Sequence, residues 1–297
     1  MTALRQAQGR PERSRGAGTG SREPGAVWRQ PLLAVAFLAF ATAAAAQTPR
    51  LSNGRIESHA TTNIARDLPA LAATLTEPMW IGYAQPLIDG DHQLCDYWNN
   101  GNRYSQSTDP IRLEPADFFF VMFRIEEKQI TRIRTYSANC PLDAGGKSVH
   151  WFTGVSVNDS VNYMKTFMAP TAARKMNDSA VTVLALTEGD RALSELLTIA
   201  RDGSTSTIKG NALFWLAQRA GQKAIGTITA AIENDPDTKV KEKAVFALSQ
   251  LPKDEGVPLL IQQARTNKNP AVRKQAMFWL GQSKDPRALK FFEEILR

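Results

Sequence analysis

Side chains that commonly carry out catalysis are scarce in this sequence. Its 297 residues include two cysteines and three histidines, and they contain no G-x-S-x-G segment of the kind that holds a hydrolase serine. The three histidines, His59, His92 and His150, leave little material for a nucleophile, histidine and acid arrangement. We therefore expect a protein that is not an enzyme, with no catalytic residue and no cofactor.

Long apolar runs are missing except for one near the start. Residues 31–46, PLLAVAFLAFATAAAA, follow Arg29 and end in small residues. This run is short for a bilayer span, which needs about 20 apolar residues, and it suits a signal peptide cleaved before Gln47. We expect residues 27–46 to be that signal peptide, with an uncleaved anchor as the alternative. The mature protein is then periplasmic or secreted and has no membrane span.

The Arg-, Gly- and Ser-rich tract at residues 1–26 has no apolar periodicity, and we expect it to be disordered. It forms an unusually long lead-in to a signal peptide, which suggests a misassigned translation start near Val27. Residues 1–46 carry six Arg and two Glu, so they contribute +4 of the net charge of +7 and leave +3 on the mature chain. A charge this small argues against a nucleic-acid partner.

The two cysteines, Cys95 and Cys140, both follow the expected cleavage point. In an oxidising compartment, two cysteines in one module most simply form a disulfide. Two free thiols or two metal ligands are the alternatives. A disulfide closing this loop of about 46 residues would stabilise the module by roughly 4 kcal/mol.

The segment DGDHQLCD offers the best set of candidate metal ligands. A zinc site needs three or four converging N, S or O ligands. The interpretation that we favour is a turn, since Asp-Gly is common in turns and the cysteine is better used in a disulfide. We therefore expect no metal site among Asp89, Asp91, His92, Cys95 and Asp96.

Two further patterns have a structural and a functional interpretation. DAGGKSVHW, residues 143–151, suggests a loop that cradles an anion, but it lacks the spacing of a phosphate-binding loop, and a turn is favoured. The aromatic residues of the first half would either line a ligand groove or form half-buried core, and we favour the core. These aromatics are Trp80, Tyr83, Tyr97, Trp98 and Trp151.

The C-terminal half repeats itself with a period of 32 residues. Ala212, Ala244 and Ala276 are 32 residues apart, and each is followed four residues later by leucine. Positions four apart share one helical face, so each unit has a helix with an apolar stripe and a small residue that permits close approach. An earlier helix of each unit repeats in the same register, at Leu193, Ile225, Val257 and Leu289.

Good N-cap residues occupy one aligned position between the two helices of each unit. These residues are Thr205, Asp237 and Asn269. A degenerate unit, without such a cap, precedes them at residues 158–187. We therefore predict an all-α solenoid over residues 158–297, with one degenerate and three clear helix pairs and a terminal helix.

The segments DPDTKVKEKA and NKNPAVRKQA, together with the period and the caps, resemble HEAT repeats, particularly the short bacterial kind of phycobilisome-lyase-like proteins. The resemblance implies stacked helix pairs and a protein-binding function. The family's ladder of acidic and basic residues maps onto three pairs, and only the first keeps an acid and a base. The pairs are Asp235 with Lys241, Asn267 with Arg273, and Gly203 with Lys209.

Residues 47–157 predict a different, α+β module. ARDLPALAATL reads as a helix, and MWIGYAQPLI is rich in strand formers. DFFFVMFRIE and QITRIRTYS predict a hairpin whose first strand is nearly continuously apolar and therefore central in its sheet. The module weakly resembles the regions that precede HEAT arrays in exported bacterial proteins of unassigned function. That resemblance gives no residue a role.

Two sets of side chains on the second helices are candidates for partner binding. Basic residues in the first turns would attract an acidic partner, although a solvated face is the alternative. They are Lys209, Lys241, Lys243, Arg273 and Lys274. A repeated amide at the helix end would bind a peptide backbone, although bonding to nearby carbonyls is the alternative. These amides are Gln218, Gln250 and Gln282.

Adjacent aromatics recur on the second helices, as in QAMFWLGQ at residues 275–282. Neighbouring side chains on a helix point about 100° apart, so two different surfaces must cover them. We expect Trp279 in the core stripe and Phe278 in the seam between units. A buried Phe278 predicts that Phe278→Ala costs about 3–5 kcal/mol.

These observations favour an exported scaffold or adaptor that binds a protein or peptide partner through the concave face of the solenoid. The alternative is a ligand-binding or enzymatic first module for which the repeats are a platform. A pocket formed by Asp91, His92 and His150 would favour this alternative.

Overall fold

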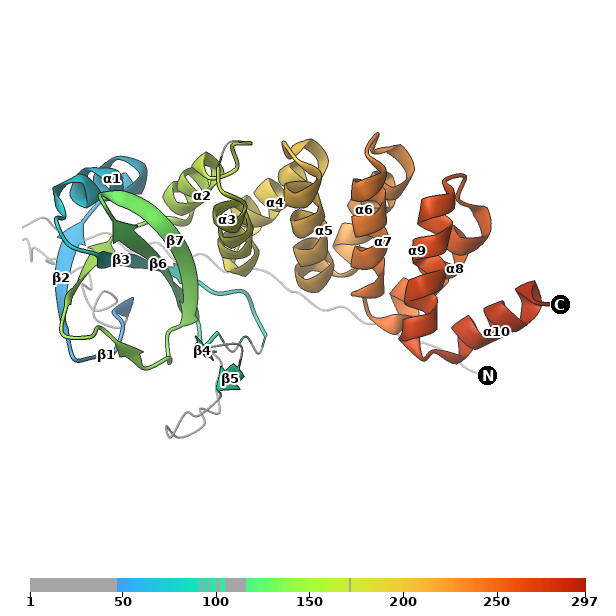
Figure 1. Cartoon of the computed structure of the whole chain (residues 1–297), viewed down its shortest axis with the longest axis horizontal. Helices are drawn as coiled ribbons and strands as arrows, with labels where there is room; N and C mark the ends of the chain where they lie inside the picture. The colour runs from blue at the N-terminus through green and yellow to red at the C-terminus, as the bar shows by residue number, and fades with distance from the viewer. Residues whose placement is uncertain are drawn as a thin grey trace, which may run out of the picture. The chain divides into compact units, whose positions relative to one another are not determined.

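The computed structural model has a mixed β-sheet module followed by stacked helix pairs, which confirms the predicted fold class (Figure 1). The expected signal peptide and leader lie outside the described residues. So do Asp91, Asp96 and the side chains of Tyr97 and Trp98. The structure describes residues 47–90, 92, 94–95, 97–99, 102–104, 116–170 and 172–297.

A five-stranded sheet forms the first module. Its order is β2 (Arg55–Ala60), β9 (Ser148–Thr153), β3 (Met79–Pro86), β6 (Phe118–Glu126) and β7 (Gln129–Ser137). The first three strands run parallel to one another, and β6 is antiparallel to β3 and β7. The predicted hairpin is β6 and β7, and its first strand is paired on both sides as expected.

Two short pairs complete the strands of this module. One joins β1 (Leu51–Ser52) to β8 (Leu142–Asp143) in parallel, and the other joins β4 (Tyr97–Asn99) to β5 (Asn102–Tyr104) in an antiparallel ladder. Both lie apart from the five-stranded sheet in strand pairing.

Both faces of β6 are buried, which explains its nearly continuous apolar sequence. Phe119, Val121 and Phe123 enter the large core on the helix-covered face. The alternate residues Phe120 and Met122 enter a smaller core that also contains Trp151 and Cys140. The period-two alternation of a strand therefore divides one apolar run between two cores.

The predicted disulfide joins Cys95 to Cys140, with the two Cα atoms 5.3 Å apart. It connects the segment after β3 to the segment after β7. Cys140 is buried in the smaller core, whereas Cys95 lies partly buried beside it. The disulfide therefore fixes these two segments against the face of the sheet that carries the smaller core, to which no described helix contributes.

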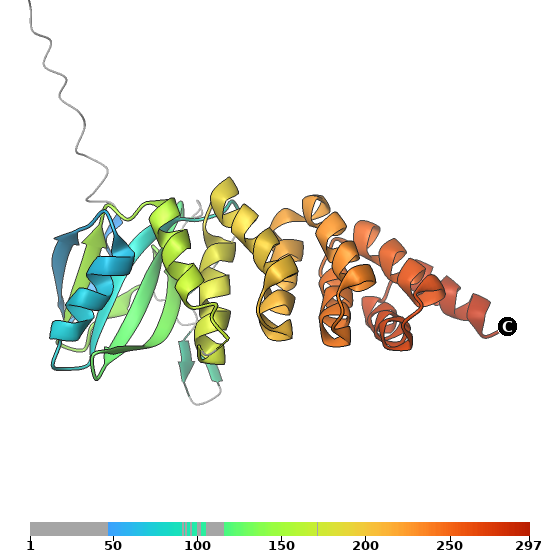
Figure 2. The ribbon, with the colours of Figure 1, turned by 90° about the horizontal axis from the view of Figure 1, so that it is seen from above.

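Ten helices occur among the described residues. One, α1 (Ile64–Thr74), belongs to the sheet module. The others form four consecutive pairs and a single last helix, which stand side by side in chain order (Figure 2). The pairs are α2 (Val157–Thr166) with α3 (Arg174–Leu186), α4 (Asp190–Asp202) with α5 (Ser206–Ala220), α6 (Gln222–Asn234) with α7 (Thr238–Ser249), and α8 (Lys253–Thr266) with α9 (Pro270–Ser283); the last is α10 (Pro286–Ile295).

The predicted caps begin three of the second helices. The side chain of Thr205 accepts from the Ile208 N–H, that of Asp237 from the Lys239 N–H, and that of Asn269 from the Ala271 N–H. Each bond satisfies a donor that a helix N-terminus otherwise leaves free. The helix α3 of the degenerate unit begins after Ala173 and has no such side-chain bond.

One apolar core runs through both parts of the described chain. It contains Ile64 of α1, the helix-facing side of the sheet, and buried residues of each following helix as far as Phe291 of α10. The main chain also crosses between the parts, because Ile88 N–H donates to Leu186 O over 3.0 Å and Glu188 N–H to Pro86 O over 2.9 Å. The sheet is thus packed directly against the first unit of the array.

Across the part of the chain that the structure describes, no helix has both the length and the apolar character needed to span a bilayer.

Removal of the disulfide should destabilise the protein by about 2–4 kcal/mol, because the bond closes a loop with a sequence separation of 45 in the unfolded chain. Urea unfolding of the Cys95→Ser, Cys140→Ser double variant, followed by circular dichroism, checks this. Treatment of the unmodified protein with a reductant should give the same loss. A double variant as stable as the parent would contradict the prediction.

Candidate functional site: aromatic and amide side chains on the second helices

The second helices of the units pack against one another in a row. Ala212, Ala244 and Ala276 are fully buried, and their small side chains allow α5, α7 and α9 to approach closely. Because the units share a period of 32 residues, equivalent positions of successive helices fall side by side. A side chain that repeats in the sequence therefore repeats along one face of the solenoid.

Aromatic side chains form a continuous line across these helices. The Phe214 and Phe246 rings stack with centroids 5.8 Å apart and planes at 4°. The Phe246 ring then lies 4.9 Å from Trp279, which in turn meets Phe278 edge-on at 5.0 Å. We call these four rings, together with the repeated glutamines, the aromatic–amide row. The glutamines are Gln218, Gln250 and Gln282.

The expectation for Phe278 is wrong, because its side chain is 52% exposed rather than buried in a seam. The reason is its place in the array. The Phe214 and Phe246 rings each contact a ring of the following second helix, whereas the Phe278 ring contacts Trp279 of its own helix. Trp279 is partly buried against the core, as expected. The row therefore ends in an accessible aromatic ring.

The three repeated glutamines lie four residues after the phenylalanines, on the same helical face. Gln218 Nε2 donates to Gln250 Oε1 over 3.4 Å, and Gln250 Nε2 donates to Ser249 Oγ over 3.0 Å. Gln218 and Gln282 are exposed, and Gln250 is half-buried. An exposed amide keeps both donor and acceptor capacity for another molecule.

Three of the five basic candidates are already bound within the solenoid. Lys209 Nζ donates to Asp235 Oδ2 over 2.8 Å. Lys241 Nζ donates to the carbonyls of Ile232 and Glu233, over 2.8 and 2.7 Å. Arg273 Nη1 reaches the carbonyls of residues 267 and 268, over 2.8 and 3.1 Å. Lys241 and Arg273 thus satisfy carbonyls at the ends of the first helices.

Asp235 and Lys241, the one ladder pair with an acid and a base, bond to other partners and not to each other. Asp235 instead accepts from Lys209 of the preceding unit, and its other oxygen accepts from the Asp237 N–H over 2.9 Å. The side chain of Lys209 is 17% exposed and that of Asp235 7% exposed, so this ion pair is largely shielded from water. Asp235 therefore bonds to a lysine of the preceding unit and so connects the two units.

The other two basic candidates stay closer to solvent. Lys274 is exposed and Lys243 is half-buried. The Lys243 stem lies over Gly210 of the preceding second helix, where a Cβ would stand 2.1 Å from Lys243 Cδ. A side chain at position 210 would therefore displace the lysine stem. These two cations flank the aromatic–amide row.

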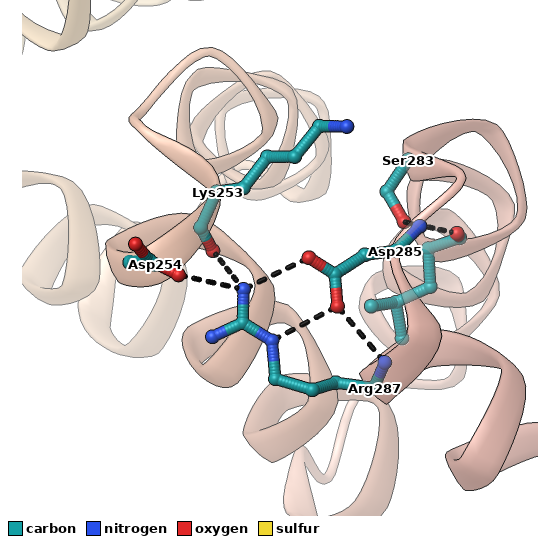
Figure 3. A network of polar contacts seen from close by, with 6 residues as sticks. Lys253, Asp254, Ser283, Asp285 and Arg287 are labelled. Atoms are coloured by element: carbon teal, nitrogen blue, oxygen red, sulfur yellow. Dashed lines mark hydrogen bonds and ion pairs between the residues drawn. The ribbon is translucent and has the colours of Figure 1, made fainter.

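A polar network holds the last helix to the array (Figure 3). Arg287 donates to both oxygens of Asp285, to Asp254 Oδ1 and to the Lys253 carbonyl, over 2.8 to 3.1 Å. The Asp285 side chain also caps α10 by accepting from the Arg287 N–H. These bonds from Arg287 hold the pKa of the Asp285 carboxyl at about 2, well below its usual value.

The sheet module contains a polar cluster that the sequence did not suggest. In the parallel pair of β2 and β9, Glu57 stands opposite His150. His59 Nε2 lies 3.0 Å and Glu57 Oε2 3.4 Å from His150 Nδ1, and His150 Nε2 is buried without a partner. Burial lowers the pKa of His150, and the Glu57 carboxylate opposes this effect only in part. Residues 91 apart in sequence are joined here by strand register.

The other candidates of the first half lie in turns or in the core. His92 Nε2 contacts the Asp89 carbonyl over 3.2 Å, and Cys95 is in the disulfide. Within the described ranges no group of three or more His, Cys, Asp or Glu side chains is placed to hold a metal ion.

In the glycine loop, Asp143 Oδ1 accepts from the Gly145 N–H over 2.8 Å, which closes a turn. Tyr83 and Trp151 are buried, and Trp80 is half-buried.

Comparison with known proteins bears out the HEAT resemblance. Residues 225–297 match the model of the family described as HEAT repeats. The coverage is less than half of the chain, and it corresponds to the helices from α6 to α10. No curated protein matches the sequence. HEAT repeats typically form protein-interaction scaffolds, so the match supports protein partners in general terms.

Three solved structures are similar at low identity. The complex of CpcE and CpcF of phycocyanin lyase from Nostoc sp. PCC7120 is 17% identical, with 48% of this chain and 90% of that chain covered and a TM-score of 0.37. Human deoxyhypusine hydroxylase is 16% identical, with 42% of this chain and 43% of that chain covered and a TM-score of 0.34. Escherichia coli YibA is 21% identical, with 47% of this chain and 54% of that chain covered and a TM-score of 0.33. These likenesses concern the fold alone.

Loss of the ion pair between units should destabilise the solenoid. Lys209→Met leaves the shielded Asp235 carboxylate with only its backbone bond, and we expect a loss of about 1–3 kcal/mol in the free energy of unfolding. Urea unfolding followed at a helical circular-dichroism wavelength measures it. Lys239→Met, in the first turn of α7 and exposed, is the matched control and should change little. Equal effects of the two substitutions would refute a special role for the pair.

Stability should fall on mild acidification because of His150. The unfolded histidine takes up a proton near pH 6.5, whereas the folded one, with its lowered pKa, does so only at lower pH. Below about pH 6.5 the unfolded state binds more protons, so the free energy of unfolding decreases as the pH falls. In His150→Gln this decrease should be shallower. Urea titrations at several pH values test it, and an unchanged slope would contradict the assignment.

Proposed function

We propose that the protein is an exported, non-enzymatic scaffold or adaptor that binds a protein or peptide partner through the aromatic–amide row. The observation that carries this proposal is the row itself: aromatic rings in contact with one another beside repeated amides on three successive helices. The row uses the regular spacing of the repeats to present one kind of surface over several units. An extended segment of a partner, which also has a regular spacing, fits such a surface.

The chemistry of the row suits a peptide. Aromatic rings provide large apolar contact areas at low conformational cost, and interface hot spots are enriched in Trp and Tyr. A primary amide matches the donor and acceptor of a peptide group. Phe278 adds an exposed ring at one end of the row, where a partner would remove apolar surface from water.

The cations beside the row favour an acidic partner. Lys243 and Lys274 have no acidic side chain among their described contacts, in contrast to Lys209, which is neutralised by Asp235. Lysines near a binding face steer acidic segments by long-range attraction. Binding should therefore weaken as the salt concentration rises. A nucleic-acid partner is not part of the proposal.

Export is part of the proposal and rests on the residues 31–46 and on the disulfide. Disulfides persist in oxidising compartments such as the periplasm or the cell exterior. Fractionation of cells that express the full chain, with detection of a product starting at Gln47, tests this part. A full-length product that stays in the cytosol would refute it.

The binding face is tested by selecting displayed random peptides on the full chain and measuring their affinities for variants. Phe278→Ala should weaken binding at least about tenfold, equivalent to about 1.4 kcal/mol, while the melting temperature changes little because the ring is half exposed. Leu289→Ala, an exposed apolar residue of α10, is the control and should bind like the parent. Selection of no peptide, or equal binding by Phe278→Ala, would refute the proposed face.

A further inference from the structure

A cavity of about 180 Å³ lies between α7, α8 and α9 and is partly open to solvent. Its apolar wall comes from the end of α7 and from α8. Amides and an indole from the aromatic–amide row surround its polar side. The residues that matter here are Leu251, Val257, Leu260, Trp279, Gln250 and Gln282.

The cavity adjoins the proposed binding face. Gln250, Gln282 and Trp279 line the cavity and belong to the aromatic–amide row, in which Trp279 packs on Phe246. Between the second and third helices of the row, the surface therefore continues into an apolar recess. A segment that lies along the row passes the mouth of this recess.

The size and the polarity of the recess define what fits it. A dry cavity of about 150 Å³ lined by apolar side chains binds benzene, so about 180 Å³ accommodates one aromatic ring. The indole Nε1 of Trp279 is buried without a hydrogen-bond acceptor. This unpaired donor belongs to a side chain that lines the recess.

Charges near the recess add a second requirement. Lys253 lines the recess and is exposed. The nearby Asp254 carboxylate is engaged by Arg287 over 3.1 Å. A ligand with carboxylates next to its apolar group is therefore matched in charge.

We propose that the recess takes one aromatic side chain of the partner peptide, flanked by acidic residues, and that Gln250 and Gln282 bond the peptide main chain at its mouth. This inference rests on the proposed function and names the side chain that the row selects. The row provides contact along the peptide, and the recess fixes its register.

The test uses the ¹⁵N-labelled full chain and two capped tripeptides, Glu-Phe-Glu and Glu-Ala-Glu. The indole N–H signal of Trp279, assigned with Trp279→Phe, should move with the aromatic peptide and stay in place with the alanine peptide. The Trp215 signal should move with neither. Val257→Phe fills the recess and should abolish the shift. Ile225→Phe, at the equivalent position one unit earlier, should retain it.

A second pair of variants covers the case in which Val257→Phe does not fold, which its thermal melt reveals. Gln282→Ala should weaken the aromatic tripeptide at least about fivefold, whereas Gln262→Ala, an exposed amide on α8 outside the recess, should not. Equal affinities of these two variants would overturn the inference.

The two proposals fail differently. If selected peptides bind in a Phe278-dependent way but the aromatic tripeptide leaves the Trp279 signal unchanged, only the recess is refuted. If the tripeptide shift persists in a folded Val257→Phe variant, the contact is superficial and the recess is again refuted. If no displayed peptide binds the full chain, the proposed function itself is overturned.

Discussion

Apolar packing without interruption, from the β-sheet to the last helix, is what every other feature of this protein relies on. Each helix pair leaves one side of its apolar stripe uncovered, so each unit depends on its neighbours. The small residues at Ala212, Ala244 and Ala276 set the distance between second helices. That distance brings Phe214 onto Phe246 and Gln218 within reach of Gln250. The proposed binding face is thus a by-product of core spacing.

Polar groups in the solenoid divide into those that hold the array together and those left for another molecule. Lys209, Lys241 and Arg273 are bound to an acid or to helix-end carbonyls. Lys243 lies two residues after Lys241 on α7, and Lys274 lies one residue after Arg273 on α9. Both therefore point to another part of the helix surface. Since a helix turns about 100° per residue, this small offset in sequence separates an internal role from an external one.

Much of this arrangement is predictable from the sequence, and the exceptions have physical causes. The period, the caps and the apolar columns depend on local spacing, so they predict the helix pairs, and the oxidising-compartment argument predicts the Cys95–Cys140 bond. The exposure of Phe278 depends on which helix follows α9 in space. The partner of Asp235 depends on the stacking distance between units. The contact of His59 with His150 depends on strand register across 91 residues, which no local pattern encodes.

The main-chain link between the sheet and the first unit has a further consequence for local opening. Local opening costs most where main-chain bonds and buried apolar contacts are dense, and least where apolar side chains stay exposed. The bonds at Ile88 and Glu188 fasten the first unit to the sheet, whereas Leu289 and Ile295 of α10, and Leu296 just after it, are exposed. Amide hydrogen exchange should therefore follow a gradient, slow beside the sheet and fast at α10. The region around Trp279 lies towards the fast end, where adaptation to a ligand requires the least disruption.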